Sequence, residues 1–204
     1  MRYETIRLLL ATAALENWDI EVLDVKTAFL YGDLDEEIYM QQPEGFIVKG
    51  QEQKVYKLKK AIYGLKQASF TWNKQIHKSL QKLGFERCLS DSGIYVRDTN
   101  STITVIIVYV DDVLFMGSHD KEIAEIKKQF MKIWECQDLG KVKEYLGMTI
   151  NYNRPLGTLV INQSAYARKV VHQHFGLENC KPTCTPLPNS YSPLPNTGQA
   201  TSEE

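Results

Sequence analysis

Residues 104–116 read TVIIVYVDDVLFM, two apolar runs that meet at the carboxylate pair Asp111-Asp112. The stretch predicts two strands with the aspartates between them. Because Asp is common in turns, an ordinary hairpin tip would account for the pair, although Asp-Asp is not the Asn-Gly or Asp-Gly that tight hairpins favour. The alternative is a metal site, since two adjacent carboxylates repel each other and a divalent cation relieves that repulsion.

A third carboxylate, Asp24, lies near the end of the predicted strand 20–25, in which apolar and polar residues alternate. Asp24 alone also fits the N-cap of a helix that starts at Val25. Three aspartates at the ends of neighbouring strands would hold two Mg²⁺ ions about 3.5–4 Å apart, which is the arrangement that catalyses in-line phosphoryl transfer.

The remaining elements alternate between helices and hairpins, which favours an α+β domain over a parallel doubly wound sheet. The apolar stripe of the second helix is predicted to comprise Phe70, Ile76, Leu80 and Leu83. The predicted helices cover residues 5–15, 67–83, 123–134 and 164–175, and further strands cover 38–40, 55–58, 145–152 and 158–161.

The charges are unevenly distributed along the 204 residues, although the net charge is −1. The first 53 residues carry a net charge of −7, residues 54–87 carry +8, and the rest carry −2. A basic segment of this kind is compatible with nucleic-acid binding. No apolar run approaches the ~20 residues of a membrane helix, so we expect no membrane partner, and four cysteines without a signal peptide suggest an intracellular protein.

Four motifs occur in the order and spacing of the reverse transcriptase of copia-type LTR retrotransposons, and the chain resembles that family from about Glu4 to about Leu187. The motifs are Asp24-x-x-x-Ala28-Phe29, Tyr63-Gly64-Leu65-Lys66-Gln67-Ala68, Tyr109-Val110-Asp111-Asp112 and Tyr145-Leu146-Gly147. The resemblance implies an RNA-directed DNA polymerase. The implied fold is a polymerase palm, a split β-α-β, ferredoxin-like sheet with helices on one face, with partial fingers and a C-terminal thumb- or connection-like segment.

The resemblance also implies a domain division. Residues 1–178 would form the palm, the partial fingers and the start of the thumb, and the Pro/Ser-rich residues 179–204 would be a linker toward an RNase H domain. The family's fingers strands upstream of Tyr3 and its RNase H domain are missing, so we expect a truncated piece of a Pol polyprotein. Ser69 replaces a proline that the family usually has.

The resemblance assigns roles residue by residue. Asp24, Asp111 and Asp112 would be the catalytic ligands of two Mg²⁺ ions (or Mn²⁺), with the Val25 carbonyl contributing. Nucleotide and template would contact Phe29, Tyr63, Gly64, Lys66 and Gln67, and the primer would contact Tyr109, Leu146 and Gly147. Phe29 would be the steric gate against a ribose hydroxyl, although an ordinary core Phe and strand-packing tyrosines are open alternatives.

The implied partners are an RNA or DNA template with its primer, deoxynucleoside triphosphates, and the integrase and RNase H regions of the parent polyprotein. An intact parent element would work in cytoplasmic virus-like particles. Phosphates would meet the basic segment, whose lysines equally fit a solvated helix face. Its members are Lys54, Lys57, Lys59, Lys60, Lys66, Lys74, Lys78, Lys82 and Arg87.

Further hypotheses stay open at this stage. The chain could be an inactive remnant that binds nucleic acid through residues 54–87. A different two-metal enzyme of the palm type, such as a nucleotide cyclase, would not use the basic segment. Lys141 or Lys143 could protonate the leaving pyrophosphate.

Overall fold

The computed structural model describes residues 2–99 and 101–181. Contacts divide the chain into two compact units, Met1–Gln163 and Ser164–Glu204, which are described separately. The first unit holds the carboxylates that the sequence singled out.

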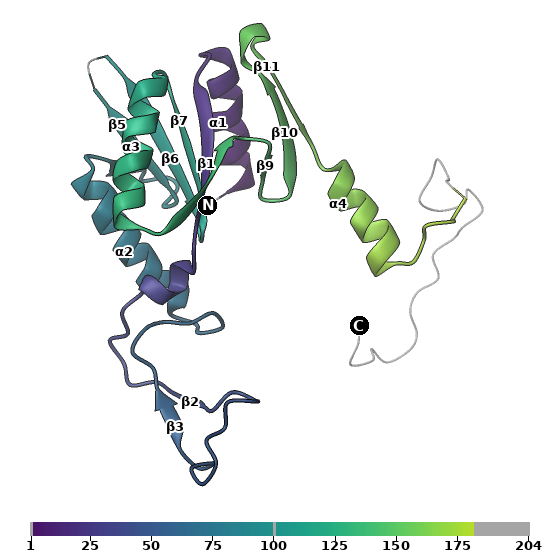
Figure 1. Cartoon of the computed structure of the whole chain (residues 1–204). Helices are drawn as coiled ribbons and strands as arrows, with labels where there is room; N and C mark the ends of the chain where they lie inside the picture. The colour runs from purple at the N-terminus through teal and green to yellow at the C-terminus, as the bar shows by residue number, and fades with distance from the viewer. Residues whose placement is uncertain (1, 100, 182–204) are drawn as a thin grey trace, which may run out of the picture. The chain divides into compact units, whose positions relative to one another are not determined.

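The first unit is a mixed α/β fold with antiparallel sheets (Figure 1). Its elements in chain order are α1 (Tyr3–Leu15), β1 (Asp19–Val25), the 3₁₀ turn η1 (Ala28–Tyr31), β2 (Tyr39–Gln41), β3 (Val55–Lys57), α2 (Ala68–Lys82), β4 (Glu86–Arg87), β5 (Ile94–Asp98), β6 (Ile103–Tyr109), β7 (Asp112–Gly117), α3 (Asp120–Ile133), β8 (Cys136–Lys141), β9 (Glu144–Tyr145), β10 (Met148–Asn153), the 3₁₀ turn η2 (Arg154–Leu156) and β11 (Thr158–Asn162).

The main sheet has six strands in the order β4-β5-β6-β7-β1-β8, and every neighbouring pair is antiparallel. After β1 the chain passes through α2 and the β4 and β5 strands and then continues as β6, with β7 lying between β1 and β6 in the sheet. In the same way α3 connects β7 to β8 with β1 between them. Both crossovers are therefore split β-α-β units, and the predicted α+β class is confirmed.

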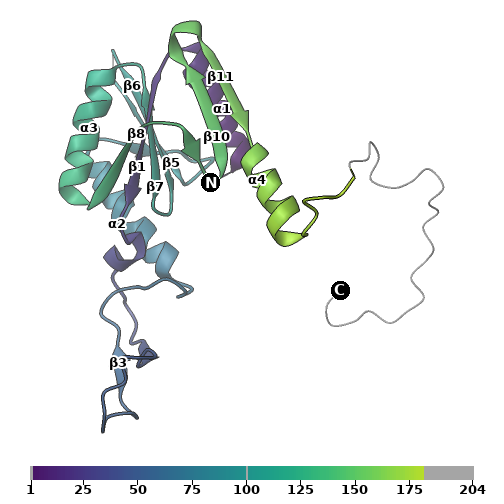
Figure 2. The ribbon, with the colours of Figure 1, turned by 45° about the vertical axis from the view of Figure 1, so that its right-hand side comes forward.

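Each face of the main sheet has its own apolar core. On the face that we call the helix-pair face, α2 and α3 pack on Leu23, Ile106 and Phe115. On the opposite face, here the hairpin face, α1 packs with the three-stranded β9-β10-β11 sheet on residues that include Val22 and Leu114. Figure 2 shows the two coverings on either side of the sheet. The expectation that the helices lie on one face is thus correct for α2 and α3 and wrong for α1.

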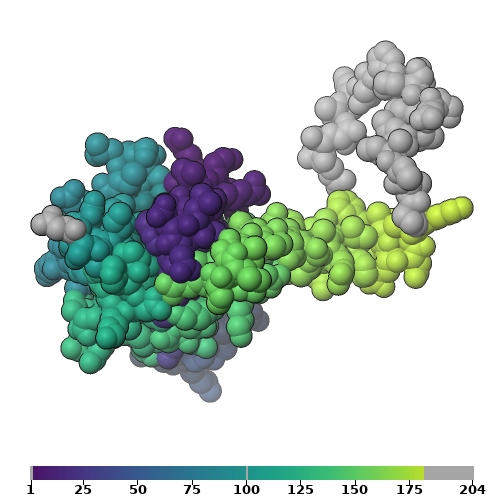
Figure 3. Space-filling view, turned by 90° about the horizontal axis from the view of Figure 1, so that it is seen from above, coloured from purple at the N-terminus to yellow at the C-terminus, as the bar shows by residue number. Residues whose placement is uncertain are grey.

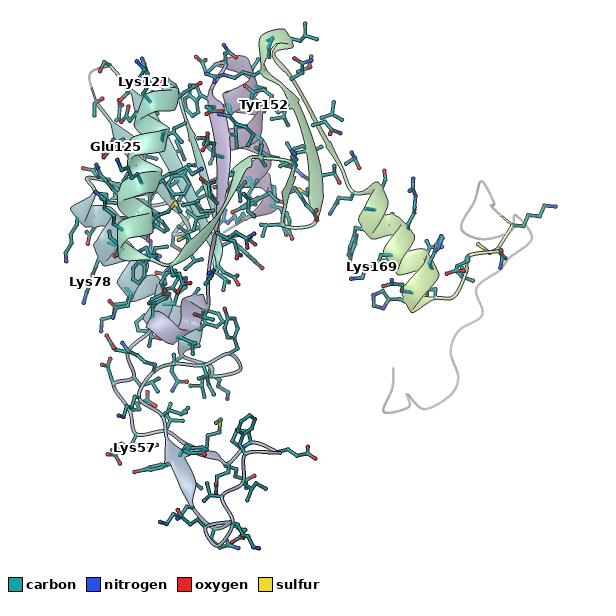
Figure 4. The ribbon with its side chains drawn as sticks, in the orientation of Figure 1. Lys57, Lys78, Lys121, Glu125, Tyr152 and Lys169 are labelled. Atoms are coloured by element: carbon teal, nitrogen blue, oxygen red, sulfur yellow. The ribbon has the colours of Figure 1, made fainter. Side chains whose placement is uncertain are left out.

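The β10-β11 ribbon is fastened to α1. Figure 3 shows the two elements side by side at the surface, and residues of α1 and β11 are in contact. The hydroxyl of Tyr152, labelled in Figure 4, donates to the carbonyl oxygens of Ala13 and Trp18 at 3.1 and 2.9 Å. One phenol on β10 thereby fixes the hairpin to the end of α1.

The main differences from the sequence-based expectation concern strands. The predicted strand 145–152 is broken by a turn at Leu146-Gly147 into β9 and β10. Three strands of the main sheet, β4, β5 and β8, were not predicted from the sequence. Of these, β8 (CQDLGK) has no apolar periodicity because it lies at the sheet edge with most residues partly or fully exposed.

The second unit contains α4 (Ser164–Lys169), which continues into a π-helical turn, η3 (Val170–His174), close to the helix predicted over 164–175. Most of the predicted linker 179–204 lies outside the described residues. Among the described residues, none of the helices is long and apolar enough to span a membrane.

Candidate active site

The two aspartates of the opening motif form the tip of the β6-β7 hairpin. Tyr109 pairs with Asp112, so Val110 and Asp111 are the two residues of the turn. Val110 has a φ of 57°, a left-handed conformation that β-branched residues rarely adopt. Strain of this kind persists only where the surroundings enforce it, and it is concentrated at functional sites. The hairpin and the functional interpretations of Asp111-Asp112 are therefore compatible.

The third aspartate is held against this tip by strand pairing. In the β1-β7 register Asp24 lies opposite Asp112. One residue further, the Val25 amide donates to the carbonyl oxygen of Asp111 at 2.8 Å. Asp24 is therefore inside a strand rather than at a helix N-cap, and the pairing of β1 with β7 brings the three predicted carboxylates together at one end of these two central strands.

The alternation of side chains fixes the face that these groups occupy. Val22 of β1, Ile107 of β6 and Leu114 of β7 belong to the core of the hairpin face. Since side chains two residues apart share a face, Asp24, Tyr109 and Asp112 also lie on the hairpin face. The turn Leu146-Gly147 belongs to the β9-β10 hairpin that covers the same face.

The three carboxylates influence one another electrostatically. Burial raises the pKa of Asp112 from 3.8 to about 6, and the nearby negative charges of Asp111 and Asp24 contribute to the rise. This repulsion is what a bound cation would relieve. The oxygen donors and their mutual repulsion therefore fit a hard divalent cation.

The carboxylates do not form a complete cage by themselves. Among the described residues, no three His, Cys, Asp or Glu side chains converge closely enough to hold an ion.

The raised pKa of Asp112 leads to a pH-dependent prediction. Below pH 3.8 this carboxyl is protonated in the folded and the unfolded chain, whereas between 3.8 and about 6 the unfolded chain loses its proton first, so stability falls as pH rises. Asp112→Asn carries no charge at any pH. In EDTA at pH 7.5 we expect the variant to be more stable by about 1 kcal/mol, allowing for solvent screening, which is about 2–4 °C in Tm.

The control is the exposed Asp98 at the end of β5, whose replacement by Asn should leave Tm unchanged at both pH values. At pH 3.5 the gain from Asp112→Asn should disappear. Thermal melts that show an equal gain at pH 3.5 and 7.5 would contradict the prediction.

Two predicted nucleotide-binding aromatics lie beside the carboxylates. The rings of Phe29 and Tyr63 are 4.6 Å apart at 50°. Burial raises the pKa of Tyr63, and the carboxylates of Asp111 and Asp24 add to the rise. Phe29 also packs at the edge of the helix-pair core. The structure thus brings these two side chains together with the aspartates.

The other predicted nucleotide-binding residues lie in the loop before α2. Gly64 has a φ of 97°, a backbone conformation that strains any other residue. Lys66 is exposed, and Gln67 immediately precedes α2. Their contact with template or nucleotide stays a prediction.

Trp72 of α2 supports the hairpin tip, a role that was not predicted from the sequence. Its indole Nε1 donates to the carbonyl oxygen of Val110 at 2.6 Å. The ring is buried and lies 4.9 Å from Trp134 in an edge-to-face arrangement. Phe70, which was expected in the apolar stripe, is 68% exposed. The buried apolar residues of α2 recur every four positions, at Ala68, Trp72, Ile76 and Leu80, and the polar end of the Trp72 indole is the signal that could have indicated a partner.

The residues predicted to contact the primer lie in the β9-β10 turn and at the end of β6. Leu146 and Gly147 have φ values of 50° and 74° and connect β9 to β10, where Tyr145 pairs with Met148. A positive φ at both central residues is typical of a type I′ hairpin turn. Tyr109 is partly exposed next to the carboxylates. These positions lie on one face of the sheet, and their contact with a primer stays a prediction.

The basic segment is partly neutralised by the acidic segment before it. Ion pairs connect Lys57 to Glu37, Lys60 to Asp33 and Lys74 to Asp35, and all of these side chains are at least half exposed. Figure 4 shows Lys57 on β3 and Lys78 on α2, both at the surface. The exposed lysines of the segment that have none of these partners are Lys54, Lys59, Lys66, Lys78 and Lys82.

The structure does not support Lys141 as a proton donor at the aspartates. Its ammonium pairs with Asp19 and with Glu21. Asp19 begins β1, whereas Asp24 is near the other end of that strand. At a rise of about 3.3 Å per residue, Lys141 is held at the wrong end of β1 for this role.

Comparison with known proteins identifies the family of the chain. A family model described as reverse transcriptase (RNA-dependent DNA polymerase) matches residues 1–189. The chain is 39% identical over 188 residues to the retrovirus-related Pol polyprotein from transposon TNT 1-94 of Nicotiana tabacum, covering 92% of this chain and 14% of that protein.

Two further relatives show the same relationship. The putative transposon Ty5-1 protein of Saccharomyces cerevisiae is 37% identical over 168 residues, which are 82% of this chain and 54% of that protein. The retrovirus-related Pol polyprotein from transposon RE1 of Arabidopsis thaliana is 33% identical over 183 residues, 90% of this chain and 12% of that protein. The chain therefore spans only part of the relatives that it matches.

Proposed function

Because this chain belongs to the reverse transcriptase (RNA-dependent DNA polymerase) family, we propose that it is the DNA-synthesising part of a copia-type retrotransposon Pol polyprotein. It would add deoxynucleotides to the 3′-hydroxyl of a primer on an RNA or DNA template. The observation that supports this proposal most directly is the pairing of Asp24 on β1 with Asp112 on β7, next to Asp111, at one end of the two strands.

In this proposal the six-stranded sheet with α2 and α3 is a polymerase palm. The two split β-α-β units support that assignment. The segment between β1 and α2 would be a partial fingers region, the chain up to residue 178 would include the start of the thumb, and residues 179–204 would lead toward an RNase H region.

The carboxylates are the proposed catalytic centre. Asp24, Asp111, Asp112 and the Val25 carbonyl would hold Mg²⁺ or Mn²⁺ ions. The ions would supply positive charge that stabilises the negative charge on the attacking primer oxygen and on the departing pyrophosphate. The chain's contribution is to hold the carboxylates in place. The strained turn at Val110, the Val25 hydrogen bond and the β1-β7 register all restrict where they lie.

The surrounding residues would bind the substrates. Phe29 and Tyr63 would contact the incoming nucleotide, with Gly64, Lys66 and Gln67 on the nucleotide and template side. Tyr109, Leu146 and Gly147 would contact the primer. Exposed lysines of the basic segment would bind phosphates without regard to sequence.

The Pol relatives suggest the wider context. We propose that the parent polyprotein also contains integrase and RNase H regions, and that an intact element assembles in cytoplasmic particles. These assignments rest on the family and are independent of the site geometry.

Primer extension tests the proposed function. The full chain is incubated with poly(rA)/oligo(dT) and dTTP, with Mg²⁺ or with EDTA, while binding of the same duplex is measured by filter retention. We expect incorporation in Mg²⁺ and none in EDTA. Salt-sensitive binding without incorporation would contradict the proposal and favour an inactive nucleic-acid-binding remnant.

Phe29 gives a specificity prediction within this proposal. Because a rigid ring beside the sugar would exclude a 2′-hydroxyl, Phe29→Ala should reduce the preference for dTTP over UTP by roughly 10- to 100-fold. The ratio of kcat/KM values for the two nucleotides measures it. The matched control is the exposed Phe46, whose replacement by Ala should leave the ratio unchanged. An unaltered ratio in Phe29→Ala would show that Phe29 is a core residue only.

A further inference from the structure

Tyr145 is a buried tyrosine on the face of the sheet that carries the carboxylates. It is the last residue of β9 and is 2% exposed. Its ring belongs to the core of the hairpin face, together with Leu114 of β7. Asp112 lies on the same face of β7, two residues from Leu114. The β9-β10 hairpin therefore places the Tyr145 phenol on the same face of the sheet as the side chains of Asp24 and Asp112.

The hydroxyl of Tyr145 has no hydrogen-bond partner in the described structure, although it is fully buried. An unsatisfied buried hydroxyl is destabilising, and its presence in a folded protein requires an explanation. The neighbouring charges suggest one. Beyond the effect of burial, the charges that raise the pKa of Tyr145 are those of Asp112 and Tyr109.

We propose that Tyr145 is a positioning residue whose buried hydroxyl is the hydrogen-bond donor for the carboxylate of Asp112. The inference deepens the proposed function and rests on it, because Asp112 is there a ligand of the catalytic cation. With one oxygen held by the phenol, Asp112 would present the other in a fixed direction. Hydrogen bonds to ligating carboxylates orient them in this way, and their loss typically lowers metal affinity 10- to 100-fold.

The chemistry of the pair is favourable. A phenol that donates to a carboxylate makes a short, charge-assisted hydrogen bond. Burial strengthens such a bond, since little water competes for either partner. Tyr145 supplies a donor that no other described group uses.

Tyr145→Phe removes the hydroxyl and leaves the ring in the core. The chain offers a matched control in Tyr95, which is also fully buried with an unpartnered hydroxyl but belongs to the helix-pair core beside His77 and Arg87. Both variants remove a buried hydroxyl and should fold, but only Tyr145→Phe should show coupling to Asp112 in Tm and a lower affinity for Mn²⁺.

The first measurement uses no cation. A double-mutant cycle of Tyr145→Phe and Asp112→Ala, followed by thermal melts in EDTA at pH 7.5, reports the pair alone. We expect the two changes in Tm to be non-additive by about 2–4 °C. A cycle of Tyr95→Phe with Asp112→Ala should be additive. Additivity in the Tyr145 cycle would overturn the contact.

The second measurement is Mn²⁺ binding by the full chain, followed by calorimetry. We expect Tyr145→Phe to bind Mn²⁺ about 10-fold more weakly than wild type, and Tyr95→Phe to bind it equally well. Equal affinity in Tyr145→Phe would overturn the positioning role. Failure of the wild-type chain to bind Mn²⁺ would instead overturn the proposed catalytic centre, while the cation-free cycle still decides the contact.

Discussion

Asp111→Asn is expected to lower primer extension by about 10³-fold. The substitution keeps the size of the side chain and the Val25 hydrogen bond, which uses the backbone carbonyl of residue 111. It removes one negative charge from the proposed cation site, and loss of several kcal/mol of transition-state stabilisation corresponds to about three decades in rate. Steady-state incorporation of dTTP on poly(rA)/oligo(dT) measures the effect.

The size-matched control is Asp98→Asn, a change of the same chemistry at an exposed position of β5. It should incorporate dTTP at the wild-type rate. Duplex binding by Asp111→Asn should be unchanged or tighter, because a negative charge near the primer is lost. Equal incorporation by wild type and Asp111→Asn would refute the assignment of Asp111 to the catalytic centre.

Trp72→Ala should have the largest effect on stability, a loss of about 3–5 kcal/mol in the free energy of unfolding. The indole is buried between α2 and the hairpin tip, packs edge-to-face on Trp134, and donates to the Val110 carbonyl. Truncation leaves a cavity and removes the donor that holds that carbonyl. In thermal melts Tm should fall by roughly 6–20 °C.

The milder Trp72→Phe separates packing from the hydrogen bond. It keeps an aromatic ring and removes the indole donor, so the hairpin tip should be less well held and kcat should fall in protein that is still folded. Trp18→Phe provides the matched control, because Trp18 is a buried tryptophan of the opposite core. Trp18→Phe should lose comparable stability with unchanged kcat. A normal kcat in Trp72→Phe would show that the Val110 hydrogen bond is dispensable for catalysis.

The two strand ends that carry Asp24 and Asp111-Asp112 could be predicted from the sequence, because each depends on the residues next to it in the chain. Two apolar runs around Asp111-Asp112 define a hairpin whatever the rest of the chain does, and the strand that ends near Asp24 is amphipathic in its own right. Their meeting in one sheet is a tertiary fact that the sequence pattern left open. The requirement of a two-metal site for a third carboxylate suggested that step, the resemblance to a known family pointed the same way, and the β1-β7 register agrees with it.

The elements that sequence reasoning missed depend on distant partners. β8 has no apolar period because it pairs with β1 only at an edge, and its register shifts near Leu23. On α2, Trp72 shares the i, i+4 spacing of the buried residues Ile76 and Leu80, whereas Phe70 is six residues before Ile76, so the helical period itself favoured Trp72 and the predicted stripe was wrong to include Phe70. What the sequence could not show is the partner of the indole, because the Val110 carbonyl that accepts its hydrogen bond is 38 positions away along the chain.

The acidic and the basic segments of the chain partly neutralise each other in the structure. The acidic and basic segments look like separate functional regions, yet Asp33, Asp35 and Glu37 pair with lysines of the basic segment. Ion pairs this exposed contribute little to stability. They do reduce the number of lysine side chains that are free to bind phosphates. The salt dependence of nucleic-acid binding should therefore correspond to fewer phosphate contacts than the nine basic residues of the segment suggest.

The central place of β1 determines the order in which the molecule opens. β1 is hydrogen-bonded to β7 on one side and β8 on the other, with a core on each face, whereas the β2-β3 hairpin pairs only with itself. Amide hydrogens of β1 should therefore exchange with deuterium only through global unfolding, and those of β2-β3 through small local openings. The strand that carries Asp24 would be among the last parts of the chain to lose its structure, after the more weakly held outer segments have already opened.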